Sequence, residues 1–158
     1  MTGEYFLGIT FGMEVKVLKS PPELEAGYAV LKELRTNLTF TDFITLYKSA
    51  HQTDGYTLIG MVENDRYVAV MGYRILHDFV HGKHLYVDDL VVIRGQQSKG
   101  IGSKLLAYAE EIAEKQGCQG LRLCTGKENE RGIKFYEREG WNPRAIAFKK
   151  VFPLRVEK

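Results

Sequence analysis

The chain has few cysteines, the residues that cross-link small proteins through disulfide bonds or zinc sites. It contains only two cysteines, Cys118 and Cys124, in 158 residues. Two cysteines cannot form a disulfide framework, and their spacing lacks the CxxC pair of a zinc knuckle. We therefore expect reduced thiols, as in a reducing compartment, and no structural metal.

Long apolar runs and blocks of like charge are also missing. No stretch approaches the roughly 18 consecutive apolar residues that a membrane-spanning helix needs. The start of the chain lacks a basic segment followed by an apolar run, so we expect no secretory signal and a cytoplasmic location. Lysine plus arginine number 22 and aspartate plus glutamate 20, a net charge of +2. So small an excess gives no argument for nucleic acid as a partner.

Length and composition are those of one globular domain. The chain has 158 residues, of which 44% are hydrophobic and 27% are charged, enough to bury a self-sufficient core. It shows no internal repeat and no interdomain linker. Residues 1–12 have weak periodicity and are predicted to form a flexible leader. A single domain is expected over residues 13–158.

Hydrophobic periodicity predicts mixed secondary structure after this leader. The predicted elements are strand 13–18, helix 21–35, a helix from an N-cap at Thr41 to Gly55, strands 56–62 and 67–75, loop 77–83, strand 84–93, helix 101–117, strand 120–124, helix 129–139, and one or two strands in 145–154. This order is not a regular βαβ alternation. It predicts a mixed α/β, or α+β, fold.

Glycine is concentrated where strand 84–93 gives way to helix 101–117. The segment 97–102 reads QSKGIG. Its glycines let backbone N–H groups approach a ligand closely, and the helix start adds unpaired N–H groups and the positive end of the helix dipole. Lys99, Ser103 and Lys104 can add further donors. The segment therefore predicts a phosphate site.

Three phosphate ligands compete for this segment. A Walker A loop has lysine after its second glycine, whereas Ile101 follows Gly100 here. A Rossmann fingerprint has a third glycine where this chain has Leu105, and it wants an acidic residue where residues 121–124 offer none. A coenzyme A diphosphate remains. An ordinary helix start after a tight turn is the other interpretation.

The glycine segment and a later helix resemble the GNAT N-acetyltransferases. Gln97, Gly100 and Gly102 match the family's pyrophosphate loop, Gln/Arg-x-x-Gly-x-Gly/Ala. Residues 129–136, NERGIKFY, match its pattern N-x-x-A-x-x-F/L-Y, with Gly132 where alanine is usual. The motifs lie about 30 residues apart and are together more specific than either alone.

The resemblance covers about residues 13–156 and implies the GNAT fold. That fold is a central, mostly antiparallel twisted sheet with a splayed parallel pair and flanking helices. It implies acetyl-CoA as co-substrate, no metal, a homodimer, and direct acetyl transfer to a primary amine of a small molecule or protein. The implied coenzyme contacts are Val91, Val92, Ile93, Gln97, Ser98, Lys99, Gly100, Ile101, Gly102, Ser103, Asn129 and Phe135.

Three side chains are candidates for the proton transfers. A protonated amine cannot attack, so a base is useful, and Asp88 and Asp89 are the candidates. Neighbouring strand residues face opposite sides, so we expect one of them in the cleft. Residues 85–90 resemble a strand of polyamine-type acetyltransferases, which favours Asp88. The resemblance also places Tyr136 beside the coenzyme A sulfur, which it would protonate. A hydrogen-bonded surface carboxylate and a core tyrosine are the other interpretations.

Other functions remain open on the same fold. A non-catalytic acyl-CoA-binding or sensor module could dispense with Tyr136 and the two aspartates. A DNA-binding adaptor is disfavoured by the near-neutral charge and by the lack of a helix-turn-helix signature. His77, His81 and His84 invite a metal site, but no carboxylate spacing supports zinc, and none is expected.

Overall fold

A computed structural model describes residues 7–10 and 13–153. The chain divides into two compact units, Met1–Leu123 and Cys124–Lys158. The prediction of a single domain therefore stays a prediction. Within the described residues no helix is long and apolar enough to cross a membrane.

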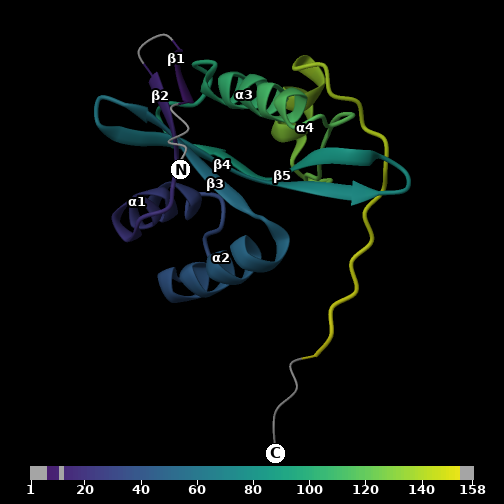
Figure 1. The fold of residues 1–158 in the computed structure, drawn as a ribbon, viewed down its shortest axis with the longest axis horizontal. Coiled ribbons are helices and arrows are strands. Elements are labelled where there is room, and N and C mark those ends of the chain that lie inside the picture. Colours follow the sequence, from purple (N-terminus) through teal and green to yellow (C-terminus); the bar gives the residue numbers. More distant parts are fainter. Residues whose placement is uncertain (1–6, 11–12, 154–158) are drawn as a thin grey trace, which may run out of the picture. The chain divides into compact units, whose positions relative to one another are not determined.

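The first unit is built on a six-stranded sheet in the order β1-β2-β3-β4-β5-β6 (Figure 1). The strands are β1 (Leu7–Thr10), β2 (Met13–Val17), β3 (Thr57–Glu63), β4 (Arg66–Asp78), β5 (Gly82–Val92) and β6 (Leu121–Leu123). All neighbouring pairs are antiparallel except β5 and β6, which are parallel. The predicted mixed fold, mostly antiparallel with one parallel pair, is confirmed.

Helices cover both faces of this sheet (Figure 1). α1 (Pro21–Leu31) and α2 (Phe40–Asp54) contribute to one buried cluster, and α3 (Ile101–Lys115) contributes to the other. Successive strand residues point to opposite faces, so Leu58 packs with Phe43 of α2 whereas Ile59 packs with Leu105 of α3. The sheet is thus the middle layer of three, and β5 is in contact with both helical layers.

Some predicted strand boundaries were wrong. Residues 7–10, part of the expected leader, form β1, and Leu7 pairs with Val15 of β2. Residues 1–6 and 11–12 of that expected leader lie outside the described residues. The predicted loop 77–83 is also shorter, because cross-strand pairing of β4 with β5 continues to Asp78 and Gly82. Only residues 79–81 connect the two strands.

The first two helices also differ from prediction. α1 ends at Leu31 rather than near Arg35, and a turn follows it. The N-cap of α2 is Thr39, not Thr41, because Thr39 Oγ1 accepts a hydrogen bond from the Asp42 N–H at 3.1 Å. The early end of α1 releases Arg35 from the helix, and its side chain reaches β5 instead.

The second unit contains α4 (Glu130–Arg138). Asn129 is its N-cap, and the side-chain Oδ1 of Asn129 accepts from the Gly132 N–H at 3.0 Å. The predicted strand in 145–154 was wrong for its described part, since residues 145–153 form no strand. Leu154 lies outside the described residues. A strand needs a partner for its backbone groups, and apolar alternation in one segment does not supply one.

Candidate active site

Beyond Val87, no described strand pairs with one edge of β5, which we call the open edge. β6 pairs with β5 only at Leu85–Val87. After Val87, the N–H and C=O groups on that edge of β5 have no partner strand in the sheet. On the opposite edge, Ile93 N–H donates to Val68 O of β4 at 3.0 Å. Backbone groups alternate in direction along an antiparallel strand. Those of Leu90 and Val92 therefore face the open edge.

This register refines the predicted backbone contacts. Val92 faces the open edge, and its C=O accepts from Gln97 Nε2 at 3.2 Å. Val91, which pairs with Val70, and Ile93 turn their backbone groups toward β4 instead. Leu90 is the open-edge residue that sequence reasoning missed. The period of two in strands would have indicated it once the orientation of one residue was known.

The loop after β5 leaves space in front of its backbone. Gly95 (φ 84°), Ser98 (φ 64°) and Gly100 (φ 76°) all lie in the left-handed region, which glycine enters without steric cost. A Cβ built on Gly95 or Gly100 would meet no atom within 4 Å. The loop thus combines an unusual backbone path with an uncrowded outer surface.

α3 begins at this loop without a side-chain cap. Its N-cap is Gly100, which has no side chain that could accept a hydrogen bond from the first turn. First-turn N–H groups of a helix lack intrahelical partners, and here they belong to Ile101, Gly102 and Ser103. Unpaired N–H groups and the helix dipole favour an anion. These features fit the diphosphate of coenzyme A.

The two aspartates of β5 have different partners. A register shift opposite Gly72 and Tyr73 leaves Asp88 between the pairs made by Val87 and Asp89. Asp88 accepts two hydrogen bonds from Arg74, Nη2 to Oδ1 at 2.7 Å and Nε to Oδ2 at 2.9 Å. These hydrogen bonds raise the pKa of Arg74. Asp88 is therefore committed to a bidentate ion pair within the sheet.

Asp89 is held by a tyrosine and an arginine. Its Oδ1 accepts from Arg35 Nε at 2.9 Å and pairs with Arg35 Nη2 at 2.7 Å, while its Oδ2 accepts from Tyr56 Oη at 2.9 Å. Burial and then the negative charge of Asp89 raise the pKa of Tyr56 well above its usual value. Tyr56 therefore stays a neutral phenol that donates to Asp89.

A cavity of about 610 Å³ opens beside Asp89 in the first unit. Its volume lies in the range of about 300–1,000 Å³ that is typical of small-molecule sites. The lining residues are Leu31, Leu34, Arg35, Thr36, Asn37, Leu38, Phe43, Leu46, Tyr47, Ala50, Tyr56 and Asp89. Asp88 is not among them, so Asp89 is the aspartate at the cavity.

Gly72 is needed for this arrangement. A Cβ at Gly72 would fall on the hydroxyl and ring carbons of Tyr56, whose ring is largely buried. We expect Gly72→Ala to lower the free energy of unfolding by about 1–3 kcal/mol, as overpacking does, and to break the Tyr56–Asp89 bond. Urea denaturation measures the loss. The control is Gly72→Ala combined with Tyr56→Ala, which removes the overlapped ring, so that adding Gly72→Ala to Tyr56→Ala should cost little stability. A single Gly72→Ala variant as stable as the wild type would contradict the close packing of Gly72 against Tyr56.

In the second unit, Tyr136 lies among aromatic side chains. Its ring centroid is 5.1 Å from that of Phe135 and 6.1 Å from that of Trp141. Burial raises the pKa of Tyr136, so it is a protonated phenol at neutral pH. That is the state an acid needs. The catalytic role of Tyr136 and the coenzyme contacts of Asn129 and Phe135 remain predictions.

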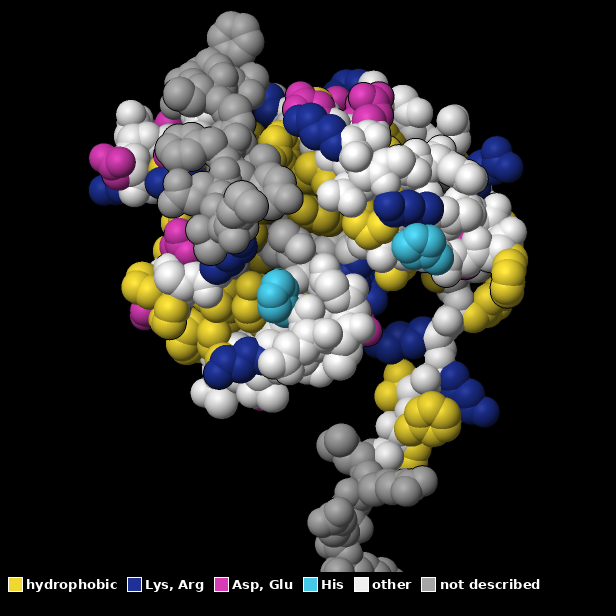
Figure 2. Space-filling view, viewed as in Figure 1, with side chains coloured by type: hydrophobic (Ala, Val, Ile, Leu, Met, Phe, Trp, Pro, Cys, Tyr) yellow, Lys and Arg dark blue, Asp and Glu magenta, His cyan; other side chains and the backbone are white. Residues whose placement is uncertain are grey.

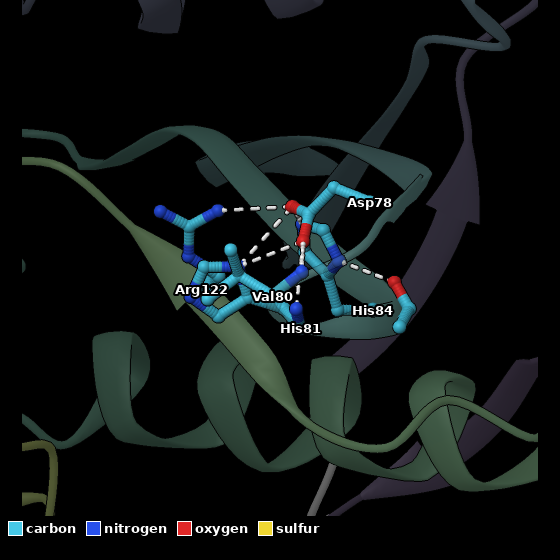
Figure 3. A network of polar contacts seen from close by, with 6 residues as sticks. Asp78, Val80, His81, His84 and Arg122 are labelled. Carbon is cyan, nitrogen blue, oxygen red and sulfur yellow. Dashed lines mark hydrogen bonds and ion pairs between the residues drawn. The ribbon is translucent and has the colours of Figure 1, made fainter.

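His81 and His84, at the end of the β4–β5 hairpin, belong to a network around Asp78 (Figure 3), whereas His77 is not part of it. Asp78 Oδ1 accepts from the N–H groups of Val80 at 2.8 Å and His81 at 2.6 Å. Its Oδ2 lies 3.7 Å from His84 Nε2 and 3.6 Å from Arg122 Nη1. The described residues contain no group of three or more side chains arranged to hold a metal ion.

This network predicts a pH dependence of stability. The bond from the His81 N–H is the largest cause that lowers the pKa of Asp78, from 3.8 to about 2. A carboxyl with a lowered pKa in the folded state stabilises the protein above its unfolded pKa, and this stabilisation is lost as pH falls. We expect the melting temperature of Asp78→Asn to fall less steeply than that of the wild type between pH 4 and 2. Thermal melts with Asp65→Asn as control measure this; equal slopes would contradict it.

Comparisons with known proteins agree with this architecture. The model of the acetyltransferase (GNAT) family matches residues 24–141. The chain belongs to the GNAT acetyltransferase family. As such it is an acetyl-CoA-dependent acyltransferase, as the sequence predicted.

Relatives and solved structures extend over most of this enzyme. The N-acetyltransferase YhdJ of Bacillus subtilis is 30% identical over 139 residues, covering 87% of this chain and 98% of the relative. The aminoalkylphosphonate N-acetyltransferase of Salmonella typhimurium is 34% identical over 86 residues, 52% of this chain and 56% of that enzyme. The structure of AAC(6')-Iy with a CoA-containing bisubstrate analog has a TM-score of 0.75 at 18% identity, covering 89% of this chain and 99% of that chain. This last likeness shows the shared fold.

Proposed function

We propose that this GNAT enzyme transfers acetyl from acetyl-CoA to a primary amine by direct attack. The observation that supports this most is that the open edge and the cavity adjoin each other on the same strand, β5. The open edge of β5 begins beside Leu90 and leads to the uncapped start of α3, while the preceding residue, Asp89, lines the cavity. Consecutive strand residues are only about 3.3 Å apart. A donor on the edge and an acceptor in the cavity would therefore be neighbours.

The open edge and the loop divide the binding of acetyl-CoA between them. The N–H groups of Ile101, Gly102 and Ser103 would hold its diphosphate, and the backbone of Leu90 and Val92 would pair with its pantetheine amides. Acetyl-CoA, when bound, supplies the acetyl thioester. The amine nitrogen forms the new C–N bond as the C–S bond breaks, so the nitrogen loses one proton and the sulfur gains one.

Two side chains are proposed for these protons. Asp89 is the better candidate to receive the amine proton, directly or through water, because it lines the cavity and Asp88 is held by Arg74. Tyr136 is the candidate to give a proton to the sulfur, because its raised pKa keeps the hydroxyl protonated.

Several finer predictions belong to the same proposal. Relatives named for aminoalkylphosphonate and thialysine support a small-molecule amine as the acceptor, and a protein amine is the alternative. A homodimer and a cytoplasmic location are proposed from the family resemblance and the reduced cysteines. Light scattering of the purified protein tests the dimer.

The central test is amine-dependent release of free thiol from acetyl-CoA. Purified protein is assayed with a panel of primary amines, and product masses are checked for a gain of one acetyl group. We expect turnover with at least one amine and no release when it is replaced by its N-acetylated form. Acetyl-CoA binding without turnover on any amine would favour the second candidate, a non-catalytic acyl-CoA-binding module.

A further inference from the structure

We propose that the cavity beside Asp89 takes a primary amine with one positive charge on an apolar body, and that Arg35 disfavours acceptors with a second cation. This inference rests on the proposed function and names its substrate class. It depends on the wall of the cavity and on the charges in that wall.

Apolar and aromatic side chains make up most of the wall. Leu31, Phe43 and Tyr47 are buried beneath it, while Leu34 and Leu46 remain 42% and 60% exposed. Figure 2 shows hydrophobic side chains gathered over the side of the first unit that carries α1 and α2. Large apolar side chains left exposed around a cavity are typical of a ligand site. They would contact the hydrocarbon part of an acceptor.

The charges in the wall cancel. Among the described residues that line the cavity, only Arg35 and Asp89 have ionised side chains, and they pair with each other. Tyr47 and Tyr56 also line the cavity, but burial raises the pKa of each, so both stay neutral. A polycationic acceptor needs several carboxylates to replace its hydration. This wall offers one, and that one is already shared with Arg35.

Asp89 can still accept one ammonium. A carboxylate has about four acceptor positions, and Arg35 and Tyr56 fill three of them. An amine bound at the fourth would lie near the Arg35 cation and against apolar side chains. A neighbouring like charge and desolvation both favour the neutral form of an amine. The same groups that limit the acceptor to one charge would thus help it lose the proton before attack.

Three amines with the same six-carbon chain test this assignment. Hexylamine ends in a methyl group, 1,6-diaminohexane ends in a second ammonium, and 6-aminohexanoate ends in a carboxylate. We measure the dissociation constant of each by calorimetry and its kcat/KM by thiol release. We expect hexylamine to bind at least about tenfold more tightly than 1,6-diaminohexane, with kcat/KM in the same order.

Two variants locate the cause of this preference. Arg35→Gln removes the cation from a half-exposed side chain, so folding should be retained, and the preference for hexylamine should shrink to about threefold or less. Lys48→Gln removes the same charge from an exposed position of α2 outside the cavity, and it should leave the preference unchanged. Leu46→Asn should weaken hexylamine more than 1,6-diaminohexane.

The outcomes separate this inference from the proposed function. Equal or tighter binding of 1,6-diaminohexane by the wild type overturns the inference, and so does the absence of binding by all three amines. Tightest binding of 6-aminohexanoate overturns it too, because Arg35 would then serve as an anion site. If hexylamine binds as expected but is not acetylated, the proposed function fails while the assignment of the cavity stands.

Discussion

Replacing Tyr136 by phenylalanine should lower kcat for acetyl transfer by about 10²–10⁴-fold, the range typical of a lost general acid. The substitution removes one hydroxyl and keeps the ring that packs with Phe135 and Trp141. Because binding of acetyl-CoA does not use this proton, its dissociation constant should change by no more than about twofold. Single-turnover kinetics and calorimetry measure the two quantities separately.

A second tyrosine serves as the matched control for this prediction. The Tyr108 hydroxyl is buried and has no hydrogen-bond partner among the described residues. Burial also raises its pKa, so it too remains a phenol. Tyr108→Phe should therefore leave kcat unchanged. If Tyr136→Phe also leaves kcat unchanged while chemistry limits the rate, Tyr136 is not the acid.

Replacing Gly102 by glutamate should weaken acetyl-CoA binding by more than about 100-fold. Gly102 lies in the first turn of α3, where the N–H groups have no side-chain cap. A carboxylate there competes for these N–H groups and repels the diphosphate. The same carboxylate interacts favourably with the helix dipole, and replacing glycine raises helix propensity. The variant should therefore melt no lower than the wild type, which separates lost binding from lost folding.

Gly102→Ala is the control that isolates charge from size. The family pattern allows alanine at this position, so binding within about threefold of the wild type is expected. Calorimetric titration with acetyl-CoA and with CoA measures both variants. Undiminished binding by Gly102→Glu would mean that the segment is an ordinary helix start and that the diphosphate binds elsewhere.

Local sequence patterns correctly predicted the helices and strands whose hydrophobic periodicity is strong. The apolar stripe and the closing glycine predicted a helix over 101–117, and α3 spans Ile101–Lys115, because helix period and capping are local properties. Boundaries set by distant contacts were predicted less well. α1 stops at Leu31, before the predicted end near Arg35, and Arg35 then bonds to Asp89, 54 positions later in the chain. The strand expected in 145–154 is absent from its described part for a related reason: a strand forms only where a neighbouring strand can pair with its backbone groups.

The pair Asp88 and Asp89 shows the same limit at the candidate site. Strand alternation alone predicted that only one of them would face the cleft. The register shift opposite Gly72 and the position of Arg74 decided which one, and these depend on how β4 pairs with β5. The resemblance favoured Asp88, whereas the cavity is lined by Asp89.

By itself, the sequence determined the family of this enzyme and predicted a phosphate-binding loop, because both rest on short segments whose glycines and helix start act locally. Only the tertiary structure decided what surrounds the cavity beside Asp89. The cavity joins Arg35, Tyr56 and Asp89, from three separate segments of the chain. Their charges cancel through hydrogen bonds that no local pattern records, since such bonds depend on distance in space and not along the chain.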